Sequence, residues 1–354
     1  MRIVRRAERS IKHTALATAL VLVCVGNLDG QWIPQTSGTD ASLRGISAVS
    51  ETIAWASGSG GTYLRTLDGG ATWQVEAIAG AEELDFRDVH AFDADTAYLL
   101  AAGPGAKSKI IKTSDGGRSW TTQYQNSEEG FLDALAFWDE KRGLALGDPV
   151  GGRFLILWTD DGGTNWKPID ANDSPQAQTG EGAFAASGTC LITGPGGRAW
   201  FATGGPGGAR LFRSTDWGRT WYAVETPIRN DSDGSGIFSV AFEDNTHGVI
   251  VGGNYPSPGE SHKNAATSFD GGRTWKNVNK PPSGYRSAVA SIRHRTYVAV
   301  GPTGTDLSRD GGKTWTSISP EGFHAIGLSR TGVGWAVGAG GKVAKFRMDL
   351  IPRD

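Results

Sequence analysis

Ser268-Phe-Asp270-Gly-Gly272-Arg-Thr274-Trp275 is one copy of a pattern that decides the fold of this chain. The same S/T-x-D-x-G-x-x-W arrangement occurs six times, which excludes chance as its origin. The six aspartates, which define six Asp boxes, are Asp68, Asp115, Asp161, Asp216, Asp270 and Asp310. A recurring motif of this kind marks one supersecondary unit that is repeated along the chain.

The distance between successive boxes is the second informative feature. The aspartates are 47, 46, 55, 54 and 40 residues apart, a period typical of propeller blades with four strands each. Short apolar runs bounded by Gly, Asp and Pro precede each box, as in 43–48, 53–58 and 62–66, and they predict strands. No long stretch has helical periodicity. Gly contributes 52 of 354 residues, while 38% are hydrophobic, so the chain is a turn-rich globular protein rather than a disordered one.

The pattern begins a seventh time after the sixth box, with strand-like runs at 323–328, 333–338 and 342–346, and then stops. Trp32-Ile-Pro-Gln resembles the segments that follow the boxes, such as Trp73-Gln-Val-Glu. We therefore predict an all-β, seven-bladed β-propeller at 31–347, closed by an N-terminal strand that joins the last blade, with a tail at 348–354.

Each box has a sufficient structural explanation. Its Asp can accept backbone N–H bonds across a hairpin, its Ser or Thr can reinforce them, and its Gly permits a positive φ. The Trp can pack between neighbouring blades. Because the boxes repeat around the periphery, we interpret them as structural and not catalytic.

The boxes, together with the run Gly334-Trp-Ala-Val-Gly338, resemble the Asp-box or bacterial neuraminidase repeat propellers, a WD40/YVTN/BNR-like group. The single seven-bladed ring is most similar to the photosystem II stability/assembly factors, and more distantly to sialidases and sortilin-type receptors. The resemblance covers about residues 31–347. It implies a fold, and it does not by itself imply a function.

The first 26 residues predict a signal peptide. Five basic residues precede an apolar run from Thr14 to Val25, which is too short for the roughly 20 residues of a membrane-spanning helix. We expect an extracytoplasmic protein, periplasmic or secreted; the alternatives are an uncleaved N-terminal membrane anchor and, less favoured, a lipoprotein at Cys24. Cys190 then remains alone and is expected to be a small buried side chain.

Propeller ligands usually bind where the innermost strands begin. Counting back from the Gly that closes each second strand, and allowing one or two extra residues in some turns, selects a ring of Arg44, Arg87, Asp133, Ser187, Phe238, Arg286 and His324, with Tyr285 beside it. Arginines suit carboxylate or phosphate groups, so the ring predicts a site for an anionic group or a peptide. The alternative is that these charges pair with nearby acids and fill a solvated channel.

An enzyme is the second hypothesis. A sialidase-like or xyloglucan-active glycosidase would use two carboxyls at the same mouth, drawn from Asp133, Asp148 and Glu181. The Phe/Tyr-Arg-Ile-Pro motif of sialidases is absent, and those enzymes have six blades. The insert Asn254–Asn264 could be either a functional loop or a tolerated insertion. Hydride chemistry has no support in the sequence.

Other signals are weak. The histidines lack metal-binding spacing, and Asn230–Gly236 lacks the closing Glu of a calcium loop, so we expect no metal and no cofactor. A net charge of −2 gives no basic field for nucleic acid. We expect a monomer that binds a protein, a peptide or a small anionic ligand without catalysis.

Overall fold

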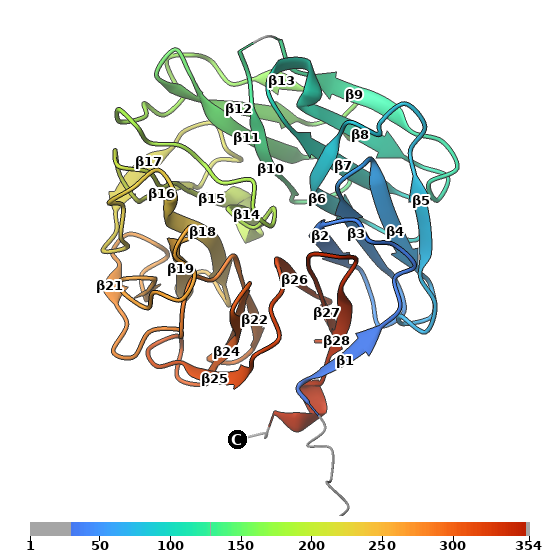
Figure 1. Ribbon diagram of the computed structural model, residues 1–354. Helices are drawn as coiled ribbons and strands as arrows, with labels where there is room; N and C mark the ends of the chain where they lie inside the picture. The colour runs from blue at the N-terminus through green and yellow to red at the C-terminus, as the bar shows by residue number, and fades with distance from the viewer. Residues whose placement is uncertain (1–29, 128, 352–354) are drawn as a thin grey trace, which may run out of the picture.

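The computed structural model describes residues 30–127 and 129–351, and these form a closed ring of seven four-stranded antiparallel sheets (Figure 1). The predicted signal peptide and Cys24 lie outside the described residues. The predicted seven-bladed propeller is confirmed.

Each blade runs from an inner strand at the axis to an outer strand at the rim. Blades one to three consist of β2(Leu43–Ala48), β3(Ala54–Gly58), β4(Thr62–Thr66) and β5(Gln74–Ala77); β6(Asp85–Ala91), β7(Ala97–Ala102), β8(Lys109–Thr113) and β9(Thr121–Gln125); and β10(Leu132–Phe137), β11(Gly143–Val150), β12(Arg153–Thr159) and β13(Lys167–Pro168).

Blades four to six consist of β14(Leu191–Gly194), β15(Arg198–Ala202), β16(Arg210–Ser214) and β17(Tyr222–Glu225); β18(Ser235–Phe242), β19(Gly248–Asn254), β20(Ala265–Ser268) and β21(Lys276–Asn277); and β22(Ala288–Arg293), β23(Thr296–Gly301), β24(Gly304–Ser308) and β25(Thr316–Ser319). The helical content of the described residues is limited to the 3-10 turns η1(Gly105–Lys107), η2(Pro195–Gly197) and η3(Met348–Leu350).

Blade seven joins the two ends of the chain, as predicted. It contains β26(Ala325–Leu328), β27(Gly334–Val337) and β28(Val343–Phe346), and β1(Trp32–Gln35) pairs with β28 as its outer strand. Trp32 packs against Phe323 and Phe346, and its indole N–H donates to Thr305 Oγ1 at 3.0 Å. The closing strand therefore ties blade seven to blade six.

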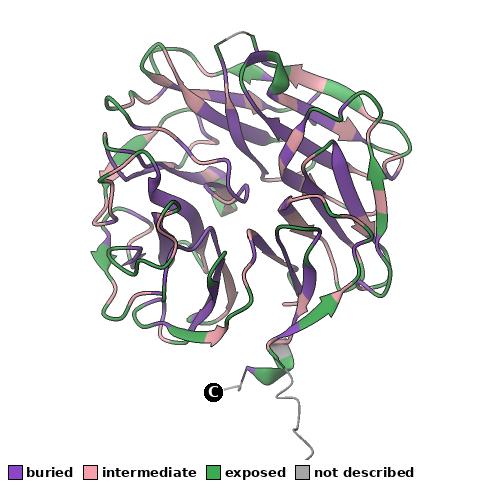
Figure 2. Cartoon of the chain, viewed as in Figure 1, coloured by how far each residue is buried: buried purple, intermediate pink, exposed green. Residues whose placement is uncertain are grey.

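The hydrophobic core is divided among the seams between blades. One apolar cluster fills each seam; for example, Trp55 and Tyr63 of blade one pack with Phe86 and Leu99 of blade two. Inner and middle strands are mostly buried, and outer strands such as β5 and β17 are mostly exposed (Figure 2). Each sheet thus buries both faces against its neighbours, as stacked repeat units require.

The Asp boxes are hairpins between the third and outer strands of blades. In the first box, the Thr66 hydroxyl donates to Asp68 Oδ1 at 2.9 Å and accepts from the N–H of Gly70, whose φ of 85° is left-handed. Asp68 also accepts from the Thr72 N–H and hydroxyl, at 2.9 and 2.6 Å. The same scheme recurs in all six boxes, except that in the third box the side-chain amide of Asn165 replaces the hydroxyl. The aspartates are thus occupied in holding turns at the rim.

Candidate functional site

Four inner strands carry a β-bulge near their first residue. The ladders of β2, β6, β10 and β18 each skip one residue, and these are Arg44, Arg87, Asp133 and Phe238. A bulge interrupts the ladder and re-aims the side chain of the extra residue. All four residues line one cavity of about 540 Å³.

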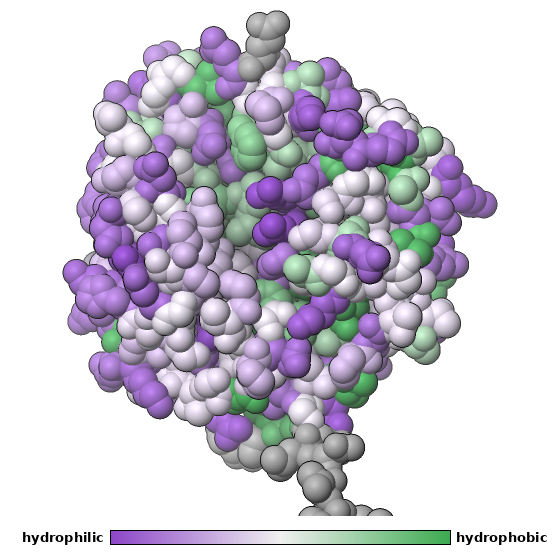
Figure 3. All heavy atoms as spheres, viewed as in Figure 1, coloured by the Kyte–Doolittle hydropathy of each residue, from purple (hydrophilic) through white to green (hydrophobic). Residues whose placement is uncertain are grey.

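This cavity, called the mouth below, lies at the axis of the ring, because all seven blades or their connecting segments contribute to its wall. Figure 3 shows the centre of the molecular face hollowed, with hydrophilic side chains beside weakly hydrophobic surface. His324 of blade seven and Tyr285 and Ser287 of blade six complete the wall next to Arg44. The site is therefore assembled from segments far apart in the sequence.

Arg44 and Arg87 give the mouth its positive charge. Arg87 donates to Asp85 Oδ2 at 2.7 Å and to the carbonyl of Ala185 at 3.1 Å. Arg44 makes no hydrogen bond or ion pair with the described residues, and its Nε is buried without an acceptor. Burial and the charge of Arg87 both lower the pKa of Arg44, and Asp85 opposes this only in part. Arg44 is thus a cation whose hydrogen-bonding capacity remains unused.

His324 adds a donor or acceptor to the same side. Its Nδ1 lies 2.9 Å from the carbonyl oxygen of Leu43 and donates to it. Burial, followed by the charge of Arg44, lowers the pKa of His324. The imidazole is accordingly neutral near pH 7 and presents its second nitrogen as an acceptor or as a site of protonation.

Asp133, Asp148 and Asp233 form the acidic part of the wall. Burial raises the pKa of Asp133 well above its usual range; the charge of Asp148 adds to this, and Arg87 counteracts it. Burial also raises the pKa of Asp148, which accepts the N–H of Ala183 at 2.9 Å. Proton uptake by these carboxyls reduces the negative charge that an anionic ligand would meet.

Aromatic rings form another part of the wall. Phe184 stacks on Phe238 with ring centroids 3.9 Å apart, and Tyr285 meets Phe238 edge to face at 4.7 Å. Tyr255, which is exposed, comes from the insert Asn254–Asn264 and also lines the mouth. The mouth therefore combines a cationic side with an apolar aromatic side.

The insert is fastened to the blade that supplies Tyr285. The carbonyl of Pro258 accepts the N–H of Tyr285 at 2.9 Å, and Ser261 donates to the carbonyl of Pro282 at 2.6 Å. The insert is thus part of the wall rather than a separate surface loop.

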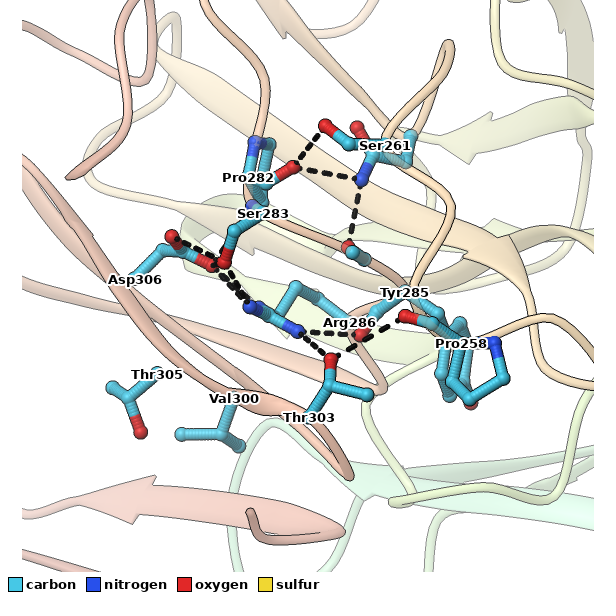
Figure 4. Close-up of polar contacts among 12 residues, drawn as sticks. Pro258, Ser261, Pro282, Ser283, Tyr285, Arg286, Val300, Thr303, Thr305 and Asp306 are labelled. Atoms are coloured by element: carbon cyan, nitrogen blue, oxygen red, sulfur yellow. Dashed lines mark hydrogen bonds and ion pairs between the residues drawn. The ribbon is translucent and has the colours of Figure 1, made fainter. Parts of the chain in front are cut away.

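Arg286, one of the residues predicted for the mouth, does not line it, and Figure 4 shows the polar contacts that it makes instead. Its side chain is fully buried: Nε donates to Asp306 Oδ2 at 2.6 Å, and the other nitrogens contact Ser283, Thr303 and the carbonyl of Tyr285. The prediction for Arg286 was wrong because the count allowed an extra residue in the turn. The residue fourteen positions before Gly301 is Ser287, and Ser287 lines the mouth.

Two other expected positions also differ. Glu181 accepts both Nε of Arg210, at 2.9 Å, and the hydroxyl of Thr203, at 2.6 Å, so its carboxylate is held by the framework. Ser187 is buried and donates to the carbonyl of Ser287 at 2.8 Å instead of facing the mouth. Blade four has no regular inner strand before Leu191, and the irregular segment brings Phe184, which the repeat pattern could not locate, into the wall.

A second hollow of about 590 Å³ adjoins the mouth. The two share Asp148, Ala183, Phe184 and Asp233 in their walls, so they lie side by side, and together they are called the groove. The wall of the second hollow consists largely of the segment 177–184, of which residues 178–180 are exposed, and of the buried Gly204 and Gly205, whose N–H groups bond within the fold. An extended chain could follow this groove from the axis towards blade four.

Among residues 30–127 and 129–351, no cluster of three His, Cys, Asp or Glu side chains could hold a metal ion. Within the same residues, no helix has the length and apolar character needed to cross a membrane. Cys190 is fully buried in the seam between blades three and four, where burial raises the pKa of its thiol.

The solved structures similar to this chain are propellers. YCF48 bound to a D1 peptide has a TM-score of 0.64 at 18% identity, covering 90% of this chain and 98% of that one. YCF48 from Cyanidioschyzon merolae has a TM-score of 0.63 at 20% identity, covering 90% and 100%. A streptogramin B lyase has a TM-score of 0.63 at 14% identity, covering 89% and 97%. These similarities establish the fold alone.

No protein-family model matches the sequence, and no curated protein matches it.

Proposed function

We propose that this chain is an extracytoplasmic Asp-box propeller that binds an anionic peptide segment at the mouth and acts as a non-enzymatic scaffold. The observation that carries the proposal is Arg44, a guanidinium with a buried Nε that lacks an acceptor at the edge of a cavity. A buried donor without a partner is costly, so a carboxylate that accepts from it gains a charge-assisted hydrogen bond.

The aromatic wall and the groove support a peptide over a small ion. Phe184, stacked on the buried Phe238, offers an apolar surface to a side chain, while the adjoining hollow is lined by the exposed segment 178–180. Extended peptides use such combinations, with main-chain hydrogen bonds for affinity and pockets for specificity. YCF48, which has the same fold, has been solved with a D1 peptide.

Binding can be measured by fluorescence anisotropy with short labelled peptides that carry a free C-terminal carboxylate, each paired with its C-terminally amidated form. We expect the carboxylate forms to bind more tightly. Arg44→Gln should weaken them about tenfold or more, because hydrogen bonds to charged groups contribute about 1.5–3 kcal/mol. Arg219→Gln is the control, since Arg219 is exposed on the outer hairpin of blade four. Equal affinity of wild type and Arg44→Gln would overturn the proposal.

A glycosidase remains the alternative, because the mouth brings Asp133 and Asp148 into one wall. Glu181 is a poor member of such a pair, since Arg210 and Thr203 occupy its carboxylate. Nitrophenyl glycosides test this alternative: hydrolysis that is lost in both Asp133→Asn and Asp148→Asn would favour the enzyme.

Export is the remaining part of the proposal, and it is supported by the basic segment and apolar run of the first 26 residues. Cell fractionation combined with the mass of the mature N-terminus tests it. An intact N-terminus in the cytoplasmic fraction would contradict it.

A further inference from the structure

A small cavity lined by arginines lies at the seam between blades four and five, at the opposite end of the strands from the mouth. Its volume is about 160 Å³. Arg198 at the start of β15 and Arg213 near the end of β16 come from blade four, and Arg273 comes from the Asp box of blade five. The residues lining the cavity include no Asp or Glu.

Basic residues at the position of Arg213 normally bond across a seam. In blades one, two and seven the corresponding residues near the end of the third strand are Arg65, Lys112 and Lys345. They donate to the carbonyls of Ala94, Gly162 and Gly69 of the next blade, at 2.7, 3.0 and 2.9 Å. Each of these cations therefore has a fixed acceptor within the fold.

Arg213 makes no such bond across its seam. The carbonyl of Gly271, which corresponds to those of Gly162 and Gly69, accepts the indole N–H of Trp200 at 3.2 Å. Arg213 makes no hydrogen bond or ion pair with the described residues, and its Nε is buried without a partner. Its guanidinium is left at the cavity, near the ring of Tyr222.

The two other arginines are only partly engaged. Arg198 donates to the carbonyl of Pro195 at 2.9 Å and Arg273 to that of Asp270 at 2.8 Å, so each keeps further N–H groups. Neither forms an ion pair with a carboxylate of the described chain. Like charges around one cavity repel one another unless an anion offsets them.

We propose that this seam cavity binds a tetrahedral oxyanion, namely a sulfate or phosphate group. The side chains of Thr215 and Asn245 also line it and, within the described residues, form no hydrogen bond, so neutral donors are available beside the guanidinium groups. The cavity of about 160 Å³ is large enough for a group of five heavy atoms. Arginine is the side chain best suited to such oxygens.

Isothermal titration calorimetry of the full chain at low ionic strength tests this inference, with sodium sulfate, inorganic phosphate and methyl phosphate as probes. We expect one saturable site, which Arg213→Gln weakens about tenfold or more, as loss of a charge-assisted contact predicts. Arg198→Gln provides a second, independent variant, and Arg219→Gln is the charge-matched control. Circular dichroism verifies that the variants are folded.

The probes also separate two sources of the group. Binding of methyl phosphate as tightly as inorganic phosphate supports a site for an esterified group, and binding of the inorganic ions alone supports a site for a free ion. Sodium chloride, added at the same ionic strength, should compete with these probes for the site less effectively than they compete with one another. Equal competition by chloride, or wild-type affinity in both Arg213→Gln and Arg198→Gln, would overturn the proposal, and neither result bears on peptide binding at the mouth.

Discussion

At the scale of single residues, Arg286 shows how a buried cation differs from one at a binding surface. Its side chain and that of Asp306 are 0% and 1% exposed, and the carboxylate lies between the guanidinium and Ser283. Removing one partner of such a pair leaves an unpaired buried charge, whereas replacing both by apolar side chains does not.

We therefore expect Arg286→Met and Asp306→Leu each to destabilise the protein by about 3–5 kcal/mol, and the double variant to be more stable than either single one. Urea unfolding measures all three. Additive losses would instead show that the two side chains act separately.

Asp68 gives a residue-scale prediction about pH. The hydroxyl and backbone N–H of Thr72 lower the pKa of Asp68 to about 2. An ionised Asp68 thus contributes stability that is fully present above its unfolded pKa of about 4 and is lost as the pH falls through about 2. Asp68→Asn should be less stable than wild type at neutral pH, and the difference in unfolding free energy should shrink on acidification. A difference independent of pH between about 5 and 2 would refute this account of the box.

At the scale of elements, the four-residue strand β1 contacts the core through only one of its two faces. Trp32 is buried against Phe323 and Phe346, while the next residue, Ile33, is 44% exposed. Successive side chains of a strand point to opposite faces, so Trp32 packs into the core while Ile33 faces solvent.

Trp32→Ala should lower the unfolding free energy by about 3–5 kcal/mol, because it removes a buried indole and leaves a cavity. Ile33→Ala in the same strand should change it by less than about 0.5 kcal/mol. Urea unfolding compares the two, and similar losses would mean that β1 stabilises the ring through its backbone pairing alone.

The inner strands also show what a repeat can predict. A strict count of fourteen residues before the closing Gly leads to Arg44, Asp133, Phe238, Ser287 and His324, all of which line the mouth. In blade two, Ala101 occupies the position of that Gly, because Ala101 pairs with Phe86 directly before the bulge and Leu100 pairs with Asp88 directly after it. Counting from Gly103 located Arg87 only by allowing two extra residues, and the same allowance misplaced Arg286.

The sequence could not predict the rest of the site, because it depends on contacts outside the repeat. Phe184 reaches the mouth through an irregular segment, and Glu181 is held by Arg210, which follows it by 29 residues. Arg213 forms none of the bonds across a seam that Arg65, Lys112 and Lys345 form, although its position in the repeat is the same. Periodicity in the sequence predicts where strands lie, but it does not predict which residues each side chain contacts.

At the scale of the whole molecule, the titrating groups of several blades act on one ligand. As the pH falls, Asp133 and Asp148, whose pKa values are raised, lose negative charge, and His324 takes up a proton below its lowered pKa. All three changes favour an anion next to Arg44.

The affinity of the mouth for a carboxylate peptide should therefore increase as the pH is lowered over the range in which the carboxylate of the peptide stays ionised. Anisotropy titrations across this range measure the trend, and Asp148→Asn should flatten it. Weaker binding at the lower pH would show that ionised Asp133 and Asp148 take part in ligand binding.

The pairing of β1 with β28 also has a consequence for how the protein is made. The first described strand of the chain finds its partner only among the last, so a ribosome or translocon that delivers the chain from its N-terminus releases an unfinished ring. Until residue 346 emerges, blade seven lacks its outer edge and the ring has two open ends, each with unpaired backbone groups that can join other chains. We therefore expect a chain that ends before β28 to aggregate or be proteolysed more readily than the full chain.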